Sequence, residues 1–187
     1  MHVGIGGQYK EVENIWVGVD GVWKEKDAVF CGIDGEWKPS DYIALVSGRL
    51  SGDESYYVVN ADNIELYAKR SATGTQAGTS VVTDVPVSLT GVSTISVEWD
   101  FECEGTNNTN AHFIASTNKT GSNSVFDARY WTERAFTKKI QVLDVSNLDG
   151  DFYLRCHAQV TSTASISQFS KVRVYRLWLD DNLIWEG

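Results

Sequence analysis

The chain has 187 residues, a formal net charge of −9 and 42% hydrophobic residues, with seven tryptophans. This composition excludes a disordered chain, and the acidic balance argues against nucleic acid and against a membrane surface as partners. The length suffices for one ordinary domain and a short additional region.

Three copies of one short pattern stand at the beginning of the chain: Val3–Lys10, Val17–Lys24 and Cys31–Lys38. Successive copies start 14 residues apart. A constant period indicates a small unit used for stacking or docking, and such a unit has little room for catalytic residues.

Each copy predicts a β-hairpin, because Asp-Gly or Gly-Gly between apolar residues favours a two-residue type I′ turn. In the second copy this turn is Asp20-Gly21. An aromatic residue then lies opposite a strand glycine in every copy, which covers the exposed backbone and fixes the register. The expected pairs are Gly4 with Tyr9, Gly18 with Trp23, and Gly32 with Trp37.

Residues 1–44 are therefore predicted to form an assembly or docking region, and residues 45–187 the main domain. A segment of about 42 residues is near the size below which a chain needs a staple or a partner to fold. Two interpretations remain open: the hairpins pack on the second part of the chain, or they dock into a larger particle. The candidate docking residues are Trp16, Trp23, Phe30 and Trp37.

The repeats resemble units of structural proteins of tailed bacteriophages, in which hairpins of the pattern V-G-V-D-G-x-W-K recur. The resemblance implies a non-enzymatic virion protein of the tail, tail tip or fibre, forming homo-oligomers and attached to other virion proteins through the hairpins. A capsid decoration or head-fibre protein is the alternative. The sequence begins with no signal peptide and has no apolar run near 18 residues, so we expect synthesis in the host cytoplasm and no membrane anchor.

The second part predicts an antiparallel two-sheet sandwich. Apolar and polar residues alternate over residues 94–103, 152–160 and 81–89, which is typical of strands with one buried face. Further strands are expected near 42–50, 55–60, 64–69, 111–117, 124–131, 136–145 and 171–179. The last changes phase, because Val172 and Val174 are even whereas Leu177 and Leu179 are odd, which predicts a β-bulge near Tyr175.

Residues 143–154 and 171–179 resemble the closing strands of jelly-roll carbohydrate-binding modules. The resemblance implies an all-β fold, with N-terminal β-hairpin repeats followed by an antiparallel two-sheet jelly-roll sandwich, and the binding of host surface carbohydrate.

Two strand faces carry candidate glycan-binding residues. One has Tyr153, Arg155 and His157, and the other has Glu98 and Asp100, together with Glu102. If both faces share one concave sheet, they form a polar groove that contains an aromatic ring, the combination that holds sugars. The alternative is a solvated sheet with cross-strand charge pairs.

Arg129 and Trp131 form a second candidate. Tyr130 and Trp131 are adjacent in a strand and point to opposite faces. One ring is therefore either exposed beside Arg129 and available for recognition, or covered by a neighbouring element.

No catalytic, cofactor or metal site is expected. The sequence has no nucleophile elbow and no phosphate-binding glycine loop. A glycan-cleaving hydrolase with two carboxylates across a cleft is the competing enzyme hypothesis. The loop Asp144–Asp151 has calcium-compatible oxygens, although turn formation explains its aspartates better.

The three cysteines, Cys31, Cys103 and Cys156, lack metal spacing. Cys103 and Cys156 are interpreted as small buried apolar residues. A disulfide between them remains an alternative if their strands are neighbours.

Overall fold

The computed structural model divides the chain into two compact units, Met1–Tyr42 and Ile43–Gly187. It describes the backbone of the six strands in the first unit, and residues 43–51, 54–71, 76–104, 109–131, 135–161 and 167–187 of the second. The side chains of residues 1–42, Arg49 and Trp131 lie outside this description.

The first unit has three separate two-stranded antiparallel sheets. They are β1 (His2–Ile5) with β2 (Gln8–Glu11), β3 (Ile15–Val19) with β4 (Val22–Lys26), and β5 (Phe30–Ile33) with β6 (Glu36–Pro39). Gly4 pairs with Tyr9, Gly18 with Trp23 and Gly32 with Trp37. The predicted registers are therefore confirmed. The side chains of Trp16, Trp23, Phe30 and Trp37 are outside the described residues, so their docking role stays a prediction.

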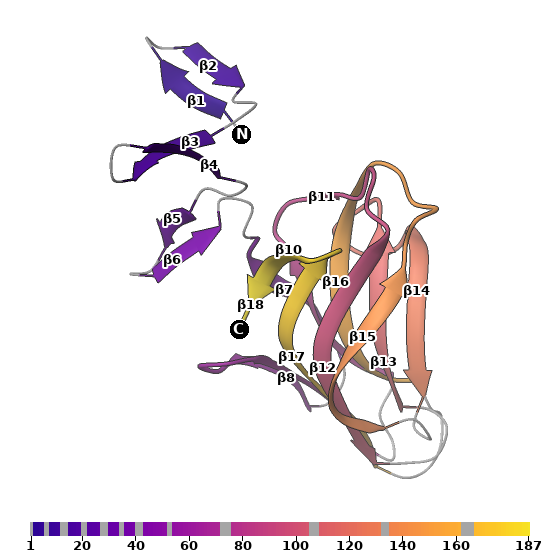
Figure 1. The fold of residues 1–187 in the computed structure, drawn as a ribbon. Helices are drawn as coiled ribbons and strands as arrows, with labels where there is room; N and C mark the ends of the chain where they lie inside the picture. Colours follow the sequence, from indigo (N-terminus) through magenta and orange to yellow (C-terminus); the bar gives the residue numbers. More distant parts are fainter. Residues whose placement is uncertain are drawn as a thin grey trace. The chain divides into compact units, whose positions relative to one another are not determined.

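The second unit is a sandwich of two antiparallel sheets, and Figure 1 shows their strands as two layers. Sheet 1 has the order β14-β13-β16-β10-β7, with β11 paired to β16. Its strands are β7 (Leu45–Ser51), β10 (Ala77–Thr83), β11 (Val87–Ser88), β13 (Thr109–Ser116), β14 (Ser124–Trp131) and β16 (Asp151–Val160).

Sheet 2 has the order β15-β12-β17-β9-β8, with β18 paired to β17. Its strands are β8 (Glu54–Val59), β9 (Ile64–Arg70), β12 (Thr94–Glu104), β15 (Phe136–Asp144), β17 (Gln168–Leu179) and β18 (Asn182–Glu186). Within the described residues every regular element is a strand. No helix long and apolar enough to cross a membrane is found among them. The predicted all-β jelly-roll sandwich is confirmed.

The core lies between the two sheets. The apolar residues of the alternating strands are buried, among them Val97 and Trp99 of β12 and Leu154 of β16. Contacts also cross the layers, since Trp99 of sheet 2 packs edge-on against Tyr130 of sheet 1 with 5.5 Å between ring centroids. The Thr79 hydroxyl of sheet 1 donates to the Tyr67 carbonyl of sheet 2 at 2.6 Å. Apolar burial with few cross-layer polar contacts thus holds the sandwich together.

The change of phase near the end of the chain is a β-bulge. Glu98 pairs with Arg176 and Trp99 pairs with Val174, so Tyr175 is an extra residue in β17. This confirms the predicted bulge. The insertion lets Val174 and Leu177 both reach the core.

Two strand predictions need correction. The alternating segment 81–89 is not one strand, because β10 ends at Thr83 and β11 begins at Val87. Pro86 has no N–H for a ladder, and Val85 is 50% exposed. The sequence analysis also missed β18, whose five residues are too few for periodicity to indicate.

Cys156 is buried in the core, and Cys103 is half-buried in the other sheet. Burial raises the pKa of the Cys156 thiol to about 12. Within the described residues, these two cysteines are not joined in a disulfide. Cys156 therefore acts as a small apolar residue.

Replacing Trp99 by Ala should lower the free energy of unfolding by about 3–5 kcal/mol, because it leaves a large cavity between the sheets. Chemical denaturation monitored by circular dichroism measures this loss. Val85→Ala at the exposed bend serves as the control and should stay within about 0.5 kcal/mol of the parent. Equal losses in both variants would contradict the assignment of Trp99 to the centre of the core.

Candidate functional site

The two predicted clusters do not share a face. Tyr153, Arg155 and His157 lie on β16 of sheet 1, whereas Glu98 and Asp100 lie on β12 of sheet 2. The expected common groove is therefore wrong. Alternation within a strand defines which residues share its two faces, but the sheet it joins depends on pairing with distant strands. The binding role of each residue stays a prediction.

The outer face of sheet 1 is hollowed and polar. Both β10 and β13 are buried along their whole length, so side chains that point away from the core are covered too. A cavity of about 200 Å³ lies on this face. We call it the sheet-1 groove; it is lined by His112, Ile114, Thr120, Gly121, Ser124, Asp127, Arg129, Arg155, His157 and Gln159.

His112, Asp127 and Arg129 form a hydrogen-bonded row across β13 and β14. The His112 Nδ1 atom lies 3.0 Å from Asp127 Oδ1, and Arg129 Nη2 donates to Asp127 Oδ2 at 2.7 Å. Burial raises the pKa of the Asp127 carboxyl, but the hydrogen bonds from His112 and Arg129 outweigh burial and leave this pKa below its usual value. Because an ionised carboxylate only accepts hydrogen bonds, His112 Nδ1 is the donor.

His112 therefore has its second ring nitrogen, Nε2, available for a further hydrogen bond in the groove. With a proton on Nδ1, the neutral ring presents a lone pair at Nε2 and the protonated ring presents an N–H there. This residue is 2% exposed, and Nε2 has no hydrogen-bond partner among the described residues.

Arg155 is held below the loop between β13 and β14. Its Nη1 donates to Ser80 Oγ at 2.9 Å, and its Nη2 donates to the Lys119 carbonyl. The loop approaches closely because Gly121 has no side chain; a Cβ there would lie 3.0 Å from Arg155 Nε. Gly121 also has a positive φ of 76°, which favours glycine. The guanidinium is therefore fixed in orientation.

His157 is next to His112 in the register of β16 and β13, and their ring centroids are 5.4 Å apart. Its Nε2 lies over Gly78 of β10, where a Cβ would approach to 2.7 Å. The two imidazoles thus share the floor of the groove, with the His157 ring leaning toward β10.

Asn110 extends the set of buried polar groups. It lies two residues before His112 in β13, on the same face. Its side-chain oxygen and nitrogen are both buried without a hydrogen-bond partner among the described residues. Buried polar groups of native proteins are rarely left unpaired, and each such group requires an explanation.

The structure brings several sequence-predicted residues to this face. Arg129, Arg155 and His157 line the groove, and the half-buried Tyr153 stands on the same side of β16. Tyr130 packs against Trp99 of the core, and the side chain of Trp131 is outside the described residues, so its binding role stays a prediction. His112 and Asn110 of β13 and Asp127 of β14 were not among the predicted glycan-binding residues, because only the pairing of β13 with β14 and β16 brings them to this face.

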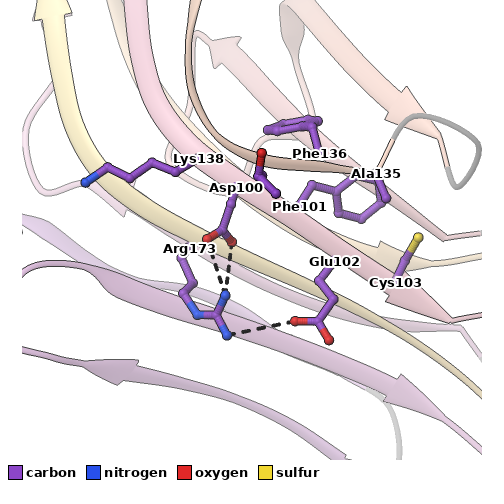
Figure 2. A pocket seen from close by; sticks show the side chains of 9 residues that line it. Asp100, Phe101, Glu102, Cys103, Ala135, Phe136, Lys138 and Arg173 are labelled. Carbon is purple, nitrogen blue, oxygen red and sulfur yellow. Dashed lines mark hydrogen bonds and ion pairs between the residues drawn. The ribbon is translucent and has the colours of Figure 1, made fainter.

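The outer face of sheet 2 carries the predicted Glu98 and Asp100. A cavity of about 460 Å³ lies beside Asp100, lined by the polar Glu102, Lys138 and Arg173 and by the apolar Phe101 and Phe136 (Figure 2). Arg173 lies between carboxylates: its Nε donates to Glu65 at 2.8 Å and its Nη1 to both Asp100 oxygens at 3.3 Å. Glu98 lies 3.4 Å from Arg176 and 3.6 Å from Lys138. These acidic groups therefore form cross-strand charge pairs, the alternative considered for this face.

Sheet 2 also carries an aromatic row that the sequence analysis missed. Tyr56, Tyr67 and Phe169 stack across β8, β9 and β17, with 4.9 Å and 5.7 Å between successive ring centroids. The sequence pattern did not indicate this row, because the three residues are far apart in the chain and only the pairing of their strands aligns their rings.

The aspartates of the loop after β15 serve its turns. Asp144 Oδ1 accepts hydrogen bonds from the Ser146 N–H at 3.0 Å and the Ser146 hydroxyl at 2.7 Å. These bonds lower the pKa of Asp144. Asp149 accepts a hydrogen bond from Thr90 at 2.7 Å. In the part of the chain that the structure describes, no group of three or more acidic, histidine or cysteine residues is arranged to hold a metal ion.

Solved structures with a similar arrangement of strands include a CBM4 (12% identity, 72% of this chain and 93% of that chain covered, TM-score 0.43). A second is CBM28, a carbohydrate-binding module specific for non-crystalline cellulose (12%, 71% and 80%, TM-score 0.37). A third contains accessory secretory proteins 1, 2 and 3 of Streptococcus pneumoniae (10%, 67% and 88%, TM-score 0.38). No protein-family model and no curated protein matches the sequence.

The Tyr175 hydroxyl at the bulge donates to Asp100 at 2.9 Å. Burial and this hydrogen bond raise the pKa of Tyr175 from 10.0 to about 12. The protonated phenol therefore stabilises the fold below pH 10, and this contribution is lost as the pH rises through about 12.

We expect the free energy of unfolding to fall between about pH 10 and about pH 12, and to fall less in Tyr175→Phe. Urea denaturation at a series of pH values measures both slopes. Tyr57→Phe, on exposed β8, is the control and should behave like the parent. Parallel curves for the parent and Tyr175→Phe would show that the hydrogen bond to Asp100 contributes nothing.

Proposed function

We propose that the second unit is a carbohydrate-binding module and that its ligand lies in the sheet-1 groove. The observation that carries the proposal is a set of buried polar atoms, His112 Nε2 and the Asn110 amide, that have no partner among the described residues and lie on an outer sheet face. Burying such atoms unpaired costs free energy, which a hydroxyl-rich ligand recovers by hydrogen bonding.

The chemistry of this face suits sugar hydroxyls. The ring nitrogens of His112 and the guanidinium groups lie in the groove, and the Asn110 amide, on the same face of β13, both donates and accepts. Tyr153 lies two residues before Arg155 on the same face of β16, and its ring offers a face on which sugar C–H groups stack.

The residues of the groove favour binding of a glycan over its cleavage. Glycoside hydrolysis requires two carboxyl groups across the scissile bond. Among the described residues that line the groove, Asp127 is the single carboxylate, and it is bonded to both His112 and Arg129. A glycan-cleaving hydrolase is therefore the less favoured hypothesis.

Replacing His112 by Ala should weaken glycan binding about tenfold or more, since one lost hydrogen bond in a buried site costs about 1–3 kcal/mol. A glycan array identifies the ligand, and calorimetry then measures the affinity. Val142→Ala on the exposed face of β15 is the control and should bind like the parent. Unchanged affinity in folded His112→Ala, or binding to no glycan, would refute the proposal.

We propose that the first unit docks the chain into a larger assembly. Because its repeats resemble units of tailed-phage structural proteins, we propose that this assembly is a phage particle. The favouring observation is the glycine–aromatic pairing repeated in all three hairpins. An isolated two-stranded hairpin is marginally stable in water, so each hairpin gains most from a partner surface.

Deleting residues 1–42 should leave a folded second unit that no longer joins the particle, because the contacts of the hairpins are lost. Co-sedimentation of a labelled chain with particles measures incorporation, and the labelled full-length chain is the control. Equal incorporation of the shortened chain would rule out docking through the hairpins.

A further inference from the structure

We propose that the edge strand β8 pairs in an antiparallel arrangement with β8 of a second copy of this chain, so that sheet 2 of both copies becomes one continuous sheet. β8 is the last strand of sheet 2 (Figure 1), and among the described residues its partner strand is β9. An edge strand presents backbone N–H and C=O groups to which another chain can add a strand. The sheet-1 groove lies on the other sheet, so the inference goes beyond the proposed function and does not depend on it.

The backbone groups that face away from sheet 2 follow from the hairpin that joins β8 to β9. The Asn60 N–H donates to the Asn63 carbonyl at 2.8 Å, so these two residues form a hydrogen-bonded pair. Hydrogen-bonded and non-hydrogen-bonded pairs alternate along an antiparallel ladder, and the pairing of β8 with β9 has no shift of register. Every second residue of β8 therefore points its N–H and C=O away from the sheet: Ser55, Tyr57 and Val59.

β8 lacks the side chains that protect sheet edges against association. Such edges usually carry lysine or other charged side chains, or proline. The other three strands that end a sheet each carry a basic residue: Arg49 in β7, Arg129 in β14, and Lys138 and Lys139 in β15. β8 has neither a basic residue nor a proline. It is therefore the edge at which a further strand meets the least obstruction.

β8 exposes apolar side chains on both of its faces. Tyr56 and Val58 are each 43% exposed on the outer face. On the other face Tyr57 is 37% exposed and Val59 68%, although Leu66, which pairs with Tyr57, is fully buried. This edge therefore extends past the part of sheet 2 that the core covers, and an added strand would remove apolar surface from water on both faces.

One register of two β8 strands uses all the outward backbone groups. When Tyr57 lies opposite Tyr57 of the second copy, Ser55 lies opposite Val59, and each facing pair exchanges both of its hydrogen bonds. A shift of two residues in either direction takes one of these residues past the end of the opposite strand. A shift of one residue would place backbone groups that are bonded to β9 at the new ladder. The backbone thus selects the symmetric register.

The side chains fit the same register. Tyr56 lies opposite Val58 of the second copy, and pairs of an aromatic with a β-branched residue stabilise antiparallel sheets. Glu54, the acidic residue of β8, lies opposite Asn60, so like charges are not opposed. The arrangement has a two-fold axis, as most homo-oligomers do. This self-complementarity of backbone and side chains favours a second copy over an unrelated strand as the occupant of the edge.

Sedimentation velocity of the full chain between about 10 μM and about 1 mM tests the proposal. We expect a weak, concentration-dependent dimer, because one strand pair makes a small interface. Val58→Lys should weaken dimerisation about tenfold or more, since a lysine at a sheet edge opposes pairing. Val142→Lys on β15, at the opposite edge of sheet 2, is the control. It changes the net charge equally at a residue that is 62% exposed, and it should dimerise like the parent.

A second pair of variants separates strand pairing from general apolar contact. Tyr57→Pro removes an outward N–H and leaves the hydrogen bonds to β9 in place, because proline is tolerated where an edge N–H faces solvent. Tyr57→Ala removes the same side chain and keeps the N–H. We expect Tyr57→Pro to weaken dimerisation at least about tenfold more than Tyr57→Ala does.

Amide hydrogen exchange followed by NMR locates the contact. The amides of Ser55, Tyr57 and Val59 should be protected at about 1 mM and should exchange faster on dilution, because the dimer dissociates.

Three results would overturn the proposal. The first is a chain that stays monomeric at about 1 mM. The second is a dimer that both Val58→Lys and Tyr57→Pro leave unchanged, which would place the interface elsewhere. The third is protection of the three amides that dilution does not alter in a monomer, which would show that another segment of the same chain covers the edge.

Discussion

The register between β13 and β16 is the constraint on which the site depends. It places His112 opposite His157 and Ile114 opposite Arg155, all on the outer face of sheet 1. The same register sends Phe113 and Cys156 into the core. A slip of one residue would exchange the two faces, so the core and the groove are fixed together by one set of backbone hydrogen bonds.

The two outer faces of the sandwich differ in how their polar side chains are paired and buried. On sheet 2, acidic and basic residues from neighbouring strands pair with one another near the surface, and such pairs contribute little each. On sheet 1, His112, Arg155 and His157 are buried, and Gly121 in the loop that follows β13 lies close to Arg155. Because burying polar groups costs free energy, this face is the one for which we propose a ligand.

In both the hairpins of the first unit and the groove of the second, a strand glycine neighbours a residue with a ring on the adjacent strand. In each hairpin a glycine pairs with an aromatic residue across the ladder. In the groove Gly78 leaves space for the His157 ring. In the groove the absent side chain of Gly78 therefore defines where the His157 ring lies.

The sequence by itself determined the hairpin registers, the strand alternation and the bulge at Tyr175, because each follows from residues close together in the chain. It also identified Arg129, Arg155 and His157, which the structure brings to one groove. It failed to separate Glu98 and Asp100 from that group, and it missed His112, Asp127 and the aromatic row on sheet 2. Only the tertiary structure decided these points, because the sheet that a strand joins and the partners of its side chains are set by pairing between distant segments.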